Sequence, residues 1–288
     1  MASLLALSRA ASEESKRLLG HRLKAHVATG LLTLVSFWCS GNLAYWFVVA
    51  GALTEIAAWV FRRKATTLHS YGEQSRRFAL LMNAYEVTKE PAEGVDLRAC
   101  LPDEVERRAA TLEDPAYYAS QKAPGRDRLV EILQESAFWS KHLYSKAATR
   151  SWIIVVFLFA GILVLTAVLV PWSQLTVSIA LARVIVVFLL LLTTIDVAGQ
   201  ALDWQDAATI SERVDLSLTR SEAPSESEIL AIFADYSVAT ATASPIPTGL
   251  YKRHWNRLER EWHEHRKTDA QKESLSSTPT GSADNSTI

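Results

Sequence analysis

Three ionisable residues interrupt otherwise apolar stretches of this chain, and their types and positions limit the chemistry open to them. Glu55, Arg183 and Asp196 each stand in a segment that is otherwise apolar and long enough to cross a bilayer. A charged side chain at such a depth is costly, so it usually faces protein or a water-filled path. The chemistry that these groups suit is the handling of ions or protons within a membrane.

Each of the three residues has a second interpretation that the sequence leaves open. Glu55 either lines a pore as a proton-sensitive group, or it is an interfacial carboxylate that is neutralised by burial or by a nearby base. Arg183 either reaches the outer surface along its flexible stem or faces inward in an oligomeric channel. Asp196 is expected at the inner end of its helix, where Lys146 or Arg150 would pair with it.

Enzymatic chemistry has no positive support in the sequence. It contains no phosphate loop, nucleophile elbow, zinc motif or dinucleotide fingerprint. His263 and His265 form an HxH pair, but the nearby chain supplies no further obvious metal ligand. The formal net charge of -1 provides no basic field for nucleic acid. We therefore expect no catalytic residue, no metal, no cofactor and no nucleic-acid partner.

The element that must position Arg183 and Asp196 is the stretch 151–199. Residues 152–170 carry no charge, Pro171 begins a short turn, and a second apolar run extends to Ile195. An apolar helix of about 20 residues matches the ~30 Å hydrocarbon core of a bilayer. This pattern predicts a transmembrane hairpin. The alternative is a buried helical hairpin in a large soluble core, although such helices rarely stay uncharged on every face.

Glu55 belongs to a first apolar block, which runs from Ala25 to Phe61. The turn residues Ser40, Gly41 and Asn42 divide it into two halves, each short but sufficient for a span. We interpret the block as a second hairpin, with a single bent span as the alternative. The predicted spans are 24–40, 42–62, 151–171 and 176–197.

Basic residues set the orientation that we predict. They flank the spans on one side only, at Arg22 and Lys24, at 62–64, and at Lys141, Lys146 and Arg150. Neither short turn carries a Lys or Arg. The positive-inside rule therefore places both termini and the central region in the cytoplasm.

The polar remainder of the chain is predicted to be helical, because no segment shows sustained period-two alternation. Spans two, three and four are expected to continue into the cytoplasm as long helices. Ser225 and Glu228 fit a capping box at the start of a further helix. The resulting fold class is an all-α membrane protein with four transmembrane helices, arranged as two hairpins, and a helical cytoplasmic domain. The predicted regions are an amphipathic helix at 1–21, hairpins at 22–62 and 151–199, cytoplasmic helices at 63–150 and 200–266, and a disordered tail at 267–288.

The order of these regions resembles a known family, the SMODS-associated four-transmembrane effectors of bacteria, which are predicted to form pores. Short clusters carry the resemblance, namely Tyr117-Tyr118, the run from Leu129 to Leu143, and the two tail clusters 245–247 and 250–253. It covers about residues 20 to 266. The chain departs from the family where a cysteine-glutamine-arginine run is expected, since 133–135 reads Leu-Gln-Glu. The related two-transmembrane effectors are a second candidate for the first hairpin.

This resemblance implies a pore-forming, multi-pass effector of a bacterial conflict or antiphage system that lies in the cell inner membrane. It further implies activation by a partner sensor protein, often through a nucleotide second messenger. Four short spans are too few to enclose a wide aqueous path, so a homo-oligomer around one axis is expected. Two alternatives remain open: a non-enzymatic membrane anchor or scaffold for a cytoplasmic partner, and an enzyme with an unrecognised site.

Overall fold

The described part of the chain is built from α-helices alone. The computed structural model describes residues 3–39, 42–113, 120, 122–169, 177–220 and 224–276, and every regular element in them is an α-helix. The longest are α1 (Leu4–Trp38), α2 (Asn42–Tyr85), α5 (Arg126–Leu169) and α6 (Val177–Arg220). The others are α3 (Ala92–Cys100), α4 (Asp103–Ala109), α7 (Glu226–Thr242) and α8 (Leu250–Ser276). The predicted all-helical class is confirmed for these residues.

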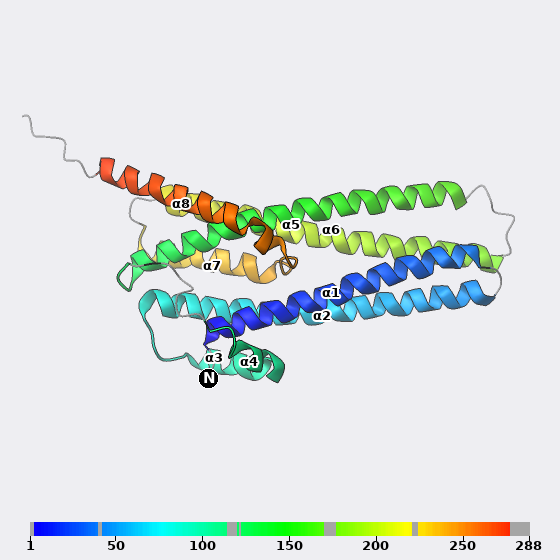
Figure 1. Cartoon of the computed structure of the whole chain (residues 1–288), viewed down its shortest axis with the longest axis horizontal. Coiled ribbons are helices and arrows are strands. Elements are labelled where there is room, and N and C mark those ends of the chain that lie inside the picture. The colour runs from blue at the N-terminus through cyan, green and yellow to red at the C-terminus, as the bar shows by residue number, and fades with distance from the viewer. Residues whose placement is uncertain are drawn as a thin grey trace, which may run out of the picture.

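The long helices form two antiparallel pairs, α1 with α2 and α5 with α6, which lie side by side (Figure 1). Helices α1 and α5 end, and α2 and α6 begin, at one end of the molecule, and α3, α4, α7 and α8 gather towards the other. Each of α2, α5 and α6 has 44 residues. At 1.5 Å per residue such a helix is about 66 Å long, roughly twice the thickness of a hydrocarbon core. The predicted continuation of these three helices beyond the spans is therefore confirmed as unbroken helix.

Among the residues that the structure describes, three helices are long and apolar enough to cross a membrane, which makes the chain compatible with a multi-pass membrane protein. They are α2, the Arg126–Ala167 part of α5 and the Val187–Arg220 part of α6. Helix α1 is not among them, because His21, Arg22, Lys24 and His26 lower the hydropathy of its second half. The span predicted at 24–40 therefore stays a prediction.

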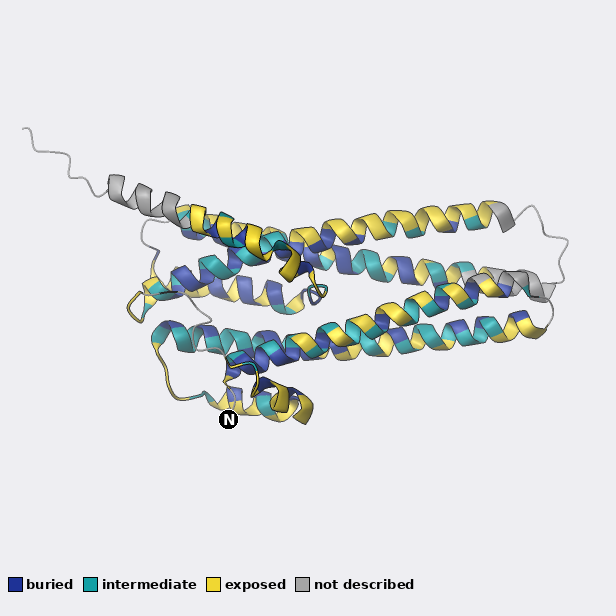
Figure 2. Cartoon of the chain, in the orientation of Figure 1, coloured by how far each residue is buried: buried dark blue, intermediate teal, exposed yellow. Residues whose placement is uncertain are grey.

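Many residues are exposed at the end of the molecule where α2 begins and α5 ends (Figure 2), and the large exposed side chains there are apolar. Phe157 and Val164 of α5 are 74% and 64% exposed, and Trp46 and Leu53 of α2 and Val184 of α6 are similarly open. Contiguous apolar surface of this extent marks an interaction site for lipid or protein. The position of this surface agrees with the candidate spans.

The other end packs as an ordinary helical body around buried apolar side chains. Leu129 and Ile132 of α5 lie in one core cluster with Leu80 of α2 and Ile229 of α7. A capping box begins α7, because Ser225 accepts from the Glu228 backbone while the Glu228 side chain accepts from the Ser225 backbone. This capping box confirms the predicted one.

The predicted amphipathic leader at 1–21 is not a separate element, since α1 continues unbroken from Leu4 to Trp38. Its first turns are buried against α2 and α4, with Leu7 fully buried. Gly72 permits the close approach, because a Cβ there would lie 3.1 Å from the Ala11 Cβ. The N-terminal turns thus belong to the helical body.

The C-terminal helix α8 continues to Ser276, past the boundary at 267 that we predicted for a disordered tail. The sequence 267–276 is polar, which suggested disorder, but its lack of Gly and Pro is also compatible with helix. Residues 277–288 lie outside the described residues, as does Tyr117-Tyr118 of the family resemblance.

Candidate functional site

Asp196 of α6 is the centre of a polar cluster that joins three of the long helices. Its Oδ2 accepts from Nη2 of Arg22 on α1, and its Oδ1 accepts from Nη1 of Arg62 on α2. The Asp196 side chain is largely buried, as is that of Arg22, whereas Arg62 is partly exposed. One carboxylate therefore holds two cations from the opposite hairpin.

Arg22 uses each of its guanidinium nitrogens within this cluster, although the residue is only 4% exposed. Besides the bond to Asp196, Nε lies 3.3 Å from Nε2 of His26, and Nη1 donates to the Gln200 Oε1 at 3.4 Å. A guanidinium presents its donors in a fixed planar fork, so these partners fix its orientation. Arg22 thereby links α1 to α6 at two positions one turn apart.

His26 bridges the two carboxylates of the cluster. Its Nδ1 lies 3.2 Å from Oε2 of Glu55, and its Nε2 lies 3.5 Å from Oδ2 of Asp196. A neutral ring that donates from Nδ1 to Glu55 and accepts at Nε2 from Nε of Arg22 fits these distances. The His26 ring therefore links Glu55 to Arg22 and lies between the two carboxylates.

Hydroxyl groups complete the surroundings of Glu55. Thr29 of α1 and Thr193 of α6 each donate to the Glu55 carboxylate at 3.4 Å, and Thr29 lies 2.7 Å from the Thr54 hydroxyl. With a neutral His26, two arginines balance two carboxylates, so the cluster has no formal net charge. Such neutrality lowers the cost of removing these charges from water. We call Arg22, His26, Glu55, Arg62, Asp196 and their hydroxyl and amide partners Thr29, Thr54, Thr193 and Gln200 the polar cluster.

From the polar cluster, a line of polar side chains continues along α1 towards its C-terminal end. Arg22, His26, Thr29, Thr33 and Ser36 recur every three or four residues, so they share one helix face. This polar face is turned inward, with Thr29 and Thr33 only 1% and 2% exposed. The opposite face is apolar and open, at Leu23, Val27, Leu31 and Val35. The distribution is the reverse of that on a helix packed in a water-soluble protein.

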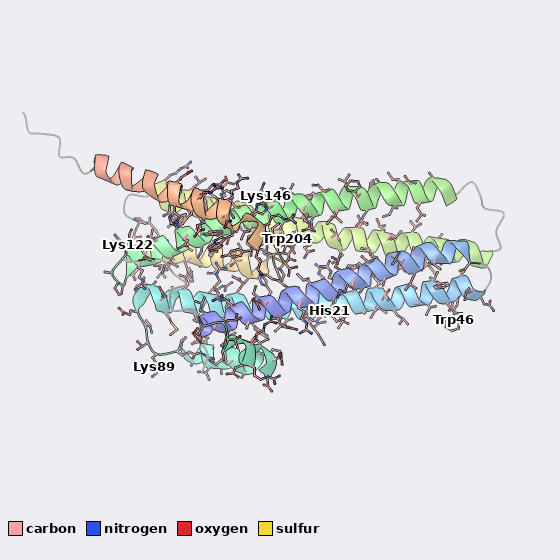
Figure 3. The ribbon with its side chains drawn as sticks, viewed as in Figure 1. His21, Trp46, Lys89, Lys122, Lys146 and Trp204 are labelled. Carbon is pink, nitrogen blue, oxygen red and sulfur yellow. The ribbon has the colours of Figure 1, made fainter. Side chains whose placement is uncertain are left out.

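The level of the cluster along the molecule is visible in Figure 3. His21, which precedes Arg22, lies near the middle of the α1–α2 pair. The helical body lies to one side of it, and Trp46, near the start of α2, lies to the other. The polar cluster thus lies at the boundary between the helical body, which has a buried apolar core, and the half of the molecule that has an apolar outer surface. That is the level at which the sequence placed Asp196.

The structure brings together two of the three residues that the sequence singled out. Glu55 and Asp196 meet through His26, although they come from different hairpins. Arg183 lies on α6, but its side chain is outside the described residues. The suggested partners Lys146 and Arg150 are exposed on α5. Arg22 and Arg62 take their place because α1 and α2 pack against the face of α6 that carries Asp196.

Sequence reasoning missed Arg22, His26 and the threonines as members of a site. The sequence identifies Arg22 as a cytoplasmic flanking charge, and the apolar pattern does not single out His26 or Thr29. The spacing of polar residues at 22, 26, 29, 33 and 36 contained the signal, because it assigns them to one face of a helix.

Known proteins add no information about this site. No group of three or more His, Cys, Asp and Glu side chains that could hold a metal ion occurs among the described residues. The groups that the polar cluster offers are charges and hydrogen-bond donors and acceptors. Comparison of the chain with protein-family models, with curated proteins and with solved structures finds no match.

Proposed function

We propose that this protein is a non-enzymatic membrane effector that conducts ions through its membrane-embedded helices. In this proposal the cytoplasmic helical body holds the conducting path closed until a partner or ligand shifts it. The observation that carries the proposal is the inward polar face of α1, which extends from the polar cluster past Thr33 to Ser36 between apolar outer surfaces. Polar groups at that depth usually face protein or water.

The same face supports a fourth span. Helix α1 has open apolar side chains at Leu23, Val27, Leu31 and Val35 beside the exposed apolar surface of its partner α2. Since lipid rather than water suits such a surface, we place 24–40 in the membrane with the other spans. Both termini and the helical body then lie on the cytoplasmic side of the inner membrane. This orientation agrees with the positive-inside rule for the flanking basic residues.

Transmission from the body to the membrane requires no flexible joint. Helices α2, α5 and α6 each contribute to the core of the body and then continue unbroken into the apolar half. A shift of the body would therefore act on the contacts of Asp196 and Glu55 directly. Several copies around one axis would provide a path wider than one subunit encloses. A sensor protein or a nucleotide as the trigger remains a prediction of the family resemblance.

A second candidate function is a membrane anchor or scaffold without conduction. The balanced charges of the polar cluster favour it, because two arginines and two carboxylates with no formal net charge also describe a structural link between the two helix pairs. This candidate predicts that breaking the cluster lowers stability and leaves the membrane impermeable.

The decisive experiment measures potassium and proton flux in liposomes that contain equal amounts of inserted protein. Asp196→Asn releases both arginines, so we expect more flux than in the unmodified protein. If the substitution destabilises only the closed state, by about 1.4 kcal/mol, the equilibrium between closed and open states shifts tenfold towards the open state. Glu55→Gln is a milder variant, because it keeps the side-chain shape, and we expect it to change ion selectivity.

Asp206→Asn is the matched control, since Asp206 is exposed on the same helix. Arg183→Ala extends the test to the outer part of α6. If flux stays at the level of empty liposomes in every variant, and also with an activating partner present, the anchor function replaces conduction.

A further inference from the structure

A cavity in the helical body, separate from the polar cluster, has the size and chemistry of a ligand site. Its volume is about 740 Å³, and its walls come from α1, α2, α5, α8 and the connection before α8. Cavities of roughly 300–1,000 Å³ are typical of small-molecule sites. The cavity therefore lies within the helical body, between the α1–α2 pair on one side and α5 and α8 on the other.

Positive charge predominates in the wall. Arg9, Lys16, Arg76 and Lys252 line the cavity, against the two carboxylates Glu73 and Glu135. Glu73 is already engaged with Arg76, at 3.2 Å. The electrostatic field in the cavity consequently favours an anion.

Lys16 differs from Arg76 of this wall, which has Glu73 as a close partner. No carboxylate lies within salt-bridge distance of its ammonium among the residues that the structure describes. Burial lowers the pKa of the Lys16 side chain, and the more distant Glu13 and Glu73 only partly oppose this shift. A partly desolvated cation without a close counter-ion is a group that a bound anion would stabilise.

Aromatic rings form another part of the same wall. Trp139 of α5 stacks on Trp255 of α8, with centroids 5.0 Å apart and an interplanar angle of 26°. Tyr251 contacts both, at 5.7 Å from Trp139 and 5.0 Å from Trp255. Trp255 and Tyr251 are 37% and 44% exposed, so these rings are open to a planar group that enters the cavity.

We propose that this cavity binds a small organic anion that carries a planar ring system. The anionic group pairs with Lys16, and the ring packs against Trp139 and Trp255. Because Lys16 belongs to the first hairpin and both tryptophans pack with the second, the bound anion connects the two. This binding goes beyond conduction, and it is measured without any flux.

The test uses pyranine, a trisulfonated pyrene dye, as the probe with full-length protein in detergent. We expect saturable binding, followed by fluorescence anisotropy, with a Kd below about 1 mM. Lys16→Gln should weaken binding about tenfold to a hundredfold, the usual range for losing one hydrogen bond to a charged group. Trp255→Ala should weaken it through loss of the ring contact. Inorganic pyrophosphate should compete more weakly than an unlabelled aromatic sulfonate, and indole should compete poorly.

Arg17→Gln is the matched control, because it removes the same charge from the next residue of α1, which is exposed outside the cavity. It should bind pyranine as the unmodified protein does. Thermal unfolding separates binding from folding, since Lys16→Gln removes a partly desolvated charge and should leave the melting temperature unchanged or higher. Absent binding, equal losses in Arg17→Gln and Lys16→Gln, or unchanged binding in both Lys16→Gln and Trp255→Ala would each overturn the proposal.

Discussion

Arg22 and Asp196 are 174 residues apart in the sequence and form an ion pair that ties α1 to α6. The pair joins the two hairpins at the level where ordinary core packing gives way to an apolar outer surface. It is also the point at which His26 connects Asp196 to Glu55. A change in the relative position of the hairpins must therefore alter this contact.

Asp196→Asn should destabilise the protein measurably. Asparagine keeps the shape of the side chain but leaves two guanidinium groups without their counter-ion. Removing one partner of a buried ion pair costs about 3–5 kcal/mol, and we expect the lower end because Arg62 is partly exposed. Denaturant unfolding in detergent should show the loss, with Asp206→Asn unchanged. Equal stability of the two variants would mean that the ion pair contributes nothing to hairpin association.

Thr33→Val should reduce ion flux while the fold stays intact. Valine has nearly the volume of threonine but no hydroxyl, so it interrupts the polar face of α1 between Thr29 and Ser36. The effect is best measured in the Asp196→Asn background, where we expect the path to be open. Thr166→Val is the control, because Thr166 lies on the exposed surface of α5. If both threonine variants conduct equally, the polar face does not line the path.

Tyr236→Phe should weaken the attachment of α7 to α2 and α5. The Tyr236 hydroxyl accepts from Arg76 at 2.6 Å, lies 2.8 Å from the Ser140 hydroxyl and donates to the Ser136 carbonyl at 3.1 Å. Burial raises the pKa of this hydroxyl, so it keeps its proton at neutral pH. Leaving buried partners unsatisfied costs about 1–3 kcal/mol, detectable by thermal unfolding.

The control for this variant is Tyr45→Phe, which removes the same hydroxyl from a tyrosine that is exposed on α2. Its melting temperature should stay that of the unmodified protein. If Tyr236→Phe has the same melting temperature as Tyr45→Phe, water replaces the lost hydroxyl with no loss of stability.

Binding of pyrenetetrasulfonate, an analogue of pyranine without the titratable hydroxyl, should weaken as the pH rises, with a midpoint below the value for an ordinary lysine. An anion pairs with the protonated form of Lys16, so affinity is full below the pKa of this group and is lost above it. Because burial lowers that pKa, the loss begins below the reference value of about 10.4. In Lys16→Gln the affinity should no longer show this pH dependence. A midpoint that persists in the variant would assign the effect to another group.

The sequence by itself determined the local features of this protein. Uninterrupted apolar and helical periodicity was sufficient to predict the long helices α2, α5 and α6, since helix formation depends on residues within a few turns of one another. The capping box at Ser225 and Glu228 was equally readable, because both partners lie three residues apart.

Only the tertiary structure decided which charges meet. For Asp196 the sequence offered Lys146 and Arg150, the bases nearest to it on the neighbouring helix, as partners. Pairing with Arg22 depends on which face of α6 the other hairpin covers, and side-chain packing rather than spacing fixes that face. The cavity beside Lys16 has the same origin, because its wall combines residues of α1 with Trp139 of α5 and Trp255 of α8. Local periodicity shapes each helix, whereas the sites arise from how the two hairpins and α8 pack together.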